Sequence, residues 1–162
     1  MLNYKTEKLG EECLTKIFIL LFIFIISVGC TRLQMTKYIQ DRNPYKQEFY
    51  ASFDKVLEAT KATLAHLGWS IAQTTDPAVY EQSRNHSDGQ EILILTETKQ
   101  SSRILYSRYY QLNVFLHALK NATEVEIRYS VVTSFPLKEF HGYRNNALAR
   151  EIFKEISSQL EK

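Results

Sequence analysis

The stretch that decides the fold is EVEIRYSV, residues 124–131. Its apolar and polar side chains alternate strictly: Val125, Ile127, Tyr129 and Val131 alternate with Glu124, Glu126, Arg128 and Ser130. This period of two predicts a β-strand with one face in a core and the other in water. We therefore expect the polar set to be a solvated face rather than a pair of catalytic carboxylates.

Several further stretches have the pattern of strands. They are residues 69–73, 78–83, 91–98 and 103–116, and short polar segments separate them. One of these segments, residues 99–102, is predicted to be a hairpin turn, and residues 137–143 are expected to be irregular. Consecutive strands joined by short turns predict a meander, which here would be one antiparallel sheet of four to five strands.

An amphipathic helix is predicted on each side of the strands. Asn43 is a candidate cap, Pro44 suits a first turn, and apolar residues then recur at helical spacing as far as Leu67. Gly68 follows as a natural stop, and a second helix is expected from about Asn145 onward. Helices with one apolar face need an apolar surface to cover. The sequence therefore predicts an α+β two-layer sandwich, with the N-terminal and C-terminal helices packed on the sheet.

The N-terminal region has the pattern of an export signal. Lys16 precedes the apolar run IFILLFIFIISV, and Gly29 and Cys30 follow it. The run has 12 residues, whereas roughly 20 are needed to span a bilayer. These residues resemble the signal peptide of bacterial lipoproteins, with Gly29 as the small residue before the cysteine; Ser27 departs from the Leu that this family prefers.

The resemblance implies that Cys30 is lipidated and that residues 1–29 are a signal peptide that is removed. Thr31 follows the cysteine, and in this family that favours the periplasmic face of the outer membrane, with the inner membrane and the cell surface as other possibilities. An uncleaved signal anchor and an ordinary cleaved signal peptide are the alternatives. Residues 30–43 are then expected to be the lipidated cysteine and a solvated tether, and residues 44–162 a single α+β domain.

A second resemblance concerns the start of this domain. The residues that carry it are FDKVLEA (53–59), LAHLGWSI (64–71) and Asp76. They resemble the helix-grip type domain of BamC-like envelope lipoproteins, although Pro77 stands where that pattern has a glycine. The resemblance implies an α+β fold and a role as an assembly or accessory factor.

Composition and motifs point away from several classes of function. The net charge of +2 is too weak to indicate nucleic-acid binding. Cys13 would be lost with the signal and Cys30 lipidated, which leaves no thiol for a disulfide or a metal site. The four histidines have no metal-ligand spacing, and neither a nucleophile elbow nor a phosphate-binding loop occurs. We therefore predict no enzyme activity, no cofactor and no metal.

The residues that favour binding are Tyr106, Arg108, Tyr109 and Tyr110, which combine aromatic and basic side chains in one strand. Tyr and Arg dominate the centres of protein interfaces, so this strand is a candidate partner-binding surface. A packed sheet face with a snorkelling Arg108 is the structural alternative. The sequence thus predicts a non-enzymatic, membrane-anchored envelope lipoprotein that binds a protein partner in envelope assembly or maintenance. A module that holds a lipid or peptidoglycan fragment between helices and sheet is the second candidate, and a small hydrolase the third.

Overall fold

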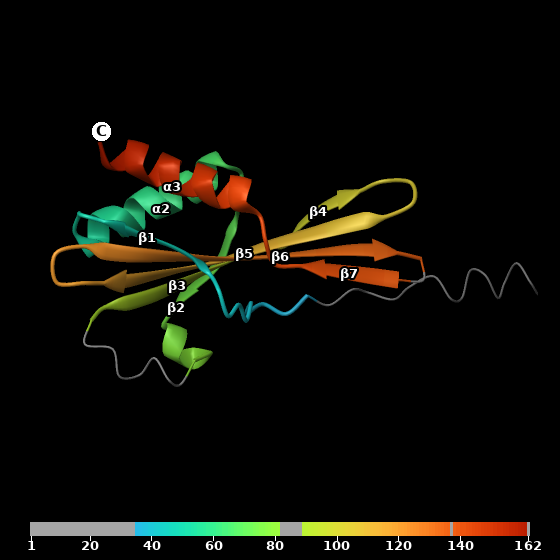
Figure 1. The fold of residues 1–162 in the computed structure, drawn as a ribbon, viewed down its shortest axis with the longest axis horizontal. Coiled ribbons are helices and arrows are strands. Elements are labelled where there is room, and N and C mark those ends of the chain that lie inside the picture. Colours follow the sequence, from blue (N-terminus) through green and yellow to red (C-terminus); the bar gives the residue numbers. More distant parts are fainter. Residues whose placement is uncertain (1–34, 82–88, 137, 162) are drawn as a thin grey trace, which may run out of the picture. The chain divides into compact units, whose positions relative to one another are not determined.

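The computed structural model describes residues 35–81, 89–136 and 138–161 (Figure 1). The elements, in chain order, are β1 (Tyr45–Phe49), α2 (Phe53–His66), β2 (Ile71–Thr75), the 3₁₀ turn η1 (Pro77–Val79), β3 (Glu91–Thr96), β4 (Lys99–Ser102), β5 (Ser107–Ala118), β6 (Thr123–Phe135), β7 (Lys138–Gly142) and α3 (Asn146–Leu160). The prediction of an α+β protein with an antiparallel sheet and two α-helices is confirmed for the described residues.

Two long strands, β5 and β6, organise the sheet. Together with β1, β3 and β2 they form five strands in the order β1-β6-β5-β3-β2, which we call the proximal half. At their other end β4 pairs with β5 and β7 pairs with β6. We call the described residues among 99–110 and 131–142 the distal half, and Figure 1 shows this end of the sheet extending beyond the helices. The described sheet therefore has seven strands, more than the four to five predicted.

The helices α2 and α3 lie on the same face of the proximal half (Figure 1). Val56 and Leu64 of α2 and Ile152 of α3 pack in one core with Leu112 and Ile127 of the sheet. The predicted stop of the first helix is also correct. Gly68 has φ of +69°, its N–H donates to the carbonyl of residue 65, and the N–H of residue 69 donates to that of Leu64. This pairing is the usual glycine-terminated helix end.

The predicted start of the first helix is wrong. Residues 45–49 form strand β1, which pairs with β6 from Tyr45 opposite Ile127 to Phe49 opposite Thr123. The helix begins only at Phe53. The spacing of Tyr45 and Phe49 fits a helix, but both residues also share one face of a strand. Pairing with β6, which a local pattern does not reveal, decides between the two.

The remaining corrections concern short elements. Residues 99–102, the predicted turn, form β4, and the turn follows at 103–106. Strand β7 lies within the segment expected to be irregular. Where a strand was expected at 78–83, the described part begins with η1, because Pro77 opens a 3₁₀ turn and the carboxylate of Asp76 accepts a hydrogen bond from the N–H of residue 78.

The opposite face of the sheet, away from the helices, is also covered in its proximal half. Leu93, Leu95 and Phe115 pack there with Tyr38 and Tyr80. Tyr38 belongs to residues 37–39, which we call the strap, and these residues lie within the segment predicted to be a solvated tether. The N–H of residue 39 donates to Asn113 Oδ1 (2.6 Å), and the carbonyl of residue 37 accepts from Gln111 and Asn113. The strap is thus part of the folded domain.

Candidate functional site

The distal half of the sheet presents a bare aromatic surface. In β5, alternate residues share a face, so Arg108 and Tyr110 lie on the side that carries the helices, as Leu112 does. Tyr106 immediately precedes β5, and its ring contacts Phe135 and Arg108 of the same side. Arg108 is opposite Thr133, and Thr133 is in turn opposite Phe140 of β7. We call the helix-side surface of the distal half the distal face. It consists of Tyr106, Arg108, Tyr110, Phe135, Lys138 and Phe140.

The aromatic rings of the distal face form a chain of contacts. The ring of Tyr106 lies 5.5 Å from that of Phe135, and the ring of Phe135 lies 5.8 Å from that of Phe140. Arg108 and Lys138 lie over the rings of Tyr106 and Phe140, at 5.2 and 4.8 Å. Phe135 is nevertheless 40% exposed and Phe140 is 50% exposed. The distal face therefore combines accessible aromatic surface with two positive charges.

Two of the predicted partner-binding residues separate from the others. Tyr109 points to the opposite face, where Gln100 Nε2 donates a hydrogen bond to its hydroxyl (3.5 Å). Tyr110 is half-buried at the margin of the helix-side core. Tyr106 and Arg108 stay together on the distal face.

Phe135 and Phe140 were missed by the sequence analysis. The segment KEFHG of residues 138–142 contains one apolar residue, so it has no alternation that would indicate a strand. Phe140 joins the distal face through the pairing of β7 with β6.

Lys99, although it lies beside the distal face in β4, has another role. Its ammonium group donates to the carbonyl of Leu67 at the end of α2 (3.0 Å) and lies 4.0 Å from the ring centre of Trp69. Burial lowers its pKa. A cation at the C-terminal end of a helix is stabilising, so Lys99 supports the helix.

Glu126, Arg128 and Ser130 of β6 are buried, so the prediction of a solvated face is wrong for them, whereas Glu124 is partly exposed and pairs with Lys46. Glu126 and Arg128 belong to a buried cluster. Glu126 is 2% exposed and Arg128 is 4% exposed. The guanidinium of Arg128 donates to Glu126 (2.6 Å), to Glu81 (2.8 Å) and to the Tyr38 hydroxyl (2.6 Å), and it also donates to the carbonyl of Ile39 (3.2 Å). It lies 4.2 Å from the ring centre of Phe115. The strap and Glu81 cover these side chains and so exclude water from them.

Burial and the neighbouring charges shift the pKa values of Tyr38 and Arg128. Burial, followed by the hydrogen bond to Glu81, raises the pKa of Tyr38 to about 12. Burial alone would lower the pKa of Arg128, but the hydrogen bond to Glu81 and the charge of Glu126 outweigh it, and the pKa is raised. Lys46 adds a further positive charge, 3.3 Å from Glu126. Ion pairs thus hold Glu81 and Glu126 to Arg128, and removal of one partner would leave a buried charge uncompensated.

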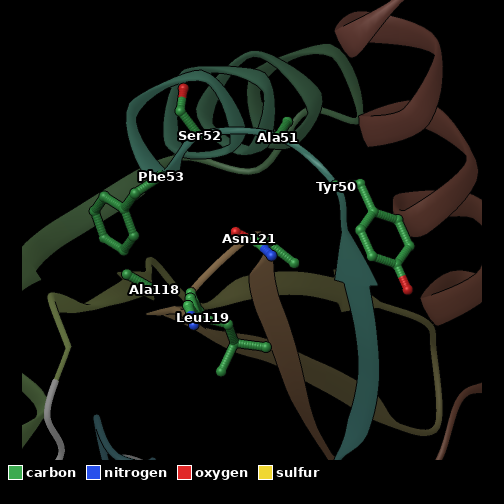
Figure 2. Close-up of a pocket in the computed structure, with 9 residues that line it drawn as sticks. Tyr50, Ala51, Ser52, Phe53, Ala118, Leu119 and Asn121 are labelled. Carbon is green, nitrogen blue, oxygen red and sulfur yellow. The ribbon is translucent and has the colours of Figure 1, made fainter.

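Two surface hollows bear on ligand binding. One, of about 340 Å³, lies between the connection from β1 to α2 and the hairpin turn from β5 to β6. Figure 2 shows Tyr50 and Phe53 on its two sides, with Leu119 and Asn121 between them. The other, of about 370 Å³, lies between the edge strand β1 and the helix α3.

Other predictions lie beyond what the structure describes. Cys30 and the signal are outside the described residues. Within those residues, no group of three or more His, Cys, Asp or Glu is placed to hold a metal ion. No helix in the same part of the chain combines the length and apolar character of a bilayer-spanning segment.

In comparisons with known proteins, no family model matches the sequence and no curated protein aligns with it significantly.

Proposed function

We propose that this chain is a non-enzymatic envelope lipoprotein, anchored through Cys30, that binds a protein partner through the distal face in envelope assembly or maintenance. The anchor rests on the resemblance of the residues up to Cys30 to a lipoprotein signal, and Thr31 favours the periplasmic side of the outer membrane. The BamC-like pattern in residues 53–76 supports the same role.

The single observation that carries the partner-binding proposal is the open aromatic row Tyr106, Phe135 and Phe140, flanked by Arg108 and Lys138. Aromatic residues and Arg are enriched in the centres of protein interfaces, where they contribute most of the binding energy. The rings are pre-arranged by the strand pairing of β5, β6 and β7, so that little ordering entropy is lost when a partner covers them.

A photo-reactive side chain in place of Phe140, introduced in cells, tests this proposal. Irradiation is expected to give a covalent adduct of defined mass with an envelope protein. The matched control is the same side chain in place of Tyr109, which lies on the opposite face and is expected to give little adduct. Arg108→Glu should reduce the adduct at Phe140 without lowering the melting temperature, because Arg108 is exposed. No adduct, or equal adducts at both positions, would contradict the proposal.

The second candidate, a binding module for a lipid or peptidoglycan fragment, is favoured by the hollow of Figure 2. Its volume suits a small ligand group, and the ring of Tyr50 beside it is 87% exposed. Titration with a soluble peptidoglycan fragment and with a short-chain phospholipid tests this candidate. Tyr50→Ala should weaken any binding, and binding that the substitution leaves unchanged would exclude this hollow.

A further inference from the structure

The turn between β4 and β5 has an unusual composition. The N–H of Arg103 donates to the carbonyl of Tyr106 (2.8 Å), which closes a tight turn with Ile104 and Leu105 at its two central positions. Such positions are normally held by Gly, Asn, Asp, Ser or Pro. Here both residues are aliphatic, and they are among the most exposed of the described residues: Ile104 is 103% exposed and Leu105 is 71% exposed. Packing within the domain does not explain this choice.

The charge around this turn is strongly one-sided. Residues 99–110 and 131–142, which make up the distal half, include four Lys or Arg residues and one acidic residue, Glu139. Lys99 is engaged at the end of α2, so Arg103, Arg108 and Lys138 are the cations near the end of the sheet. The register brings the two turns of the distal half to the same end, because Ser107 is opposite Ser134 and Lys138 is opposite Phe135. Lys138 therefore lies at the same end as Arg103.

We propose that residues 103–105, which we call the distal tip, insert into the interface of a bilayer that contains anionic phospholipid. Ile104 and Leu105 enter the boundary between headgroups and acyl chains, and Arg103 and Lys138 meet the lipid phosphates. Apolar side chains next to basic ones are the combination that binds peripheral proteins to such membranes. The exposed side chains of the tip are aliphatic, whereas the aromatic rings that are enriched at protein interfaces lie on the distal face.

The tip and the partner-binding surface adjoin at Lys138 but are otherwise distinct. The tip is the turn itself, whereas the proposed partner covers the row of rings on the distal face. Anchoring at Cys30 would keep a bilayer within reach, but the chemistry of the tip carries this inference without it. Contact at the tip would orient the distal face relative to the membrane and would restrict which partners can approach it.

Tryptophan fluorescence in reconstituted vesicles tests the tip. The full chain carries Trp69→Phe, which removes its one tryptophan, together with either Ile104→Trp or Val79→Trp. Val79 is the matched control, because it is a 68% exposed aliphatic residue of η1 that belongs neither to the tip nor to the hollow of Figure 2. The vesicles contain phosphatidylethanolamine and phosphatidylglycerol with a nitroxide-labelled lipid. Interfacial segments lie roughly 5–10 Å deep, so the Ile104→Trp chain should lose more than half of its emission and shift to the blue. The Val79→Trp chain should do neither.

The charge of the tip is tested in the same system. Arg103→Glu combined with Lys138→Glu should remove most of the quenching, and so should phosphatidylcholine in place of phosphatidylglycerol. Quenching that is absent at Ile104→Trp, equal at both positions or independent of lipid charge would overturn the proposal. The vesicles hold no other protein, so these outcomes are separate from the photo-crosslinking at Phe140. If the tip instead yields protein adducts in cells and no quenching in vesicles, it belongs to the partner interface.

Discussion

Replacement of Arg128 by Met is expected to destabilise the domain strongly. The substitution keeps an unbranched apolar stem of similar reach, but it removes the charge that pairs with Glu126 and Glu81 and the donor that holds Tyr38 and Ile39 of the strap. Glu126 is 2% exposed and would keep Lys46 at 3.3 Å but lose the closer guanidinium. Removing one partner of a buried ion pair costs about 3–5 kcal/mol, and we expect a loss of free energy of unfolding in this range.

Equilibrium unfolding in urea measures this loss, with the fluorescence of the buried Trp69 as the signal, in a fragment that begins at residue 36. The matched control is Arg108→Met, since Arg108 is exposed on the distal face; its effect should stay within about 0.5 kcal/mol. Hydrogen exchange adds a local measurement. The amide of residue 39, which donates to Asn113, should exchange faster in Arg128→Met because the strap loses its hydrogen bonds with Arg128.

A double substitution tests whether the charges act as a pair. Arg128→Met combined with Glu126→Leu removes both members, and replacing a buried pair by apolar residues is often neutral or stabilising. The double variant should therefore be more stable than Arg128→Met alone. A loss below about 0.5 kcal/mol for Arg128→Met is the scale of a surface change. It would refute the buried cluster as a source of stability.

Three further predictions test the core, the strap and the anchor. Leu64→Ala should lower the free energy of unfolding by about 2–5 kcal/mol in the same urea assay, because Leu64 is fully buried against the sheet. The pKa of Tyr38 is about 12 in the fold and about 10 in the unfolded chain. Its contribution to the free energy of unfolding is therefore complete below pH 10 and declines as the pH rises toward 12. Tyr38→Phe should flatten the pH dependence of stability in this range, and an unchanged slope would contradict the raised pKa of Tyr38. Cys30→Ser should abolish incorporation of a labelled fatty acid, and equal label in both chains would exclude the lipoprotein proposal.

The sequence was sufficient to predict the elements whose pattern is local. Strand β6 follows from its alternation, and the end of α2 follows from Gly68, whose positive φ few other residues adopt easily. The predicted start of the first helix was wrong because the spacing of Tyr45 and Phe49 fits both a helix and one face of a strand. The choice between them rests on the pairing of β1 with β6, whose residues lie far away in the sequence.

The burial of Glu126 and Arg128 could not be read from their strand for a different reason. Alternation separates the two faces of a strand, but it does not say what covers each face. The cover comes from the strap and from Glu81, and their contacts with Arg128 join residues that are distant in sequence. The distal face was found only in part, since Tyr106 and Arg108 were recognised from composition, whereas Phe135 and Phe140 join them through the pairing of β6 and β7.

The length of the central strands is the last argument for a function in the distal half. Strand β5 has 12 residues and β6 has 13, whereas strands commonly have about 5–6. The proximal half of each strand is covered on both faces, by the helices on one side and by the strap and Glu81 on the other. The distal half instead leaves Phe135 and Phe140 half exposed and carries Ile104 bare at its tip. Exposed apolar side chains that gather on one surface favour an interaction site there. We therefore propose that the extra length of β5 and β6 serves to present the distal face and the distal tip.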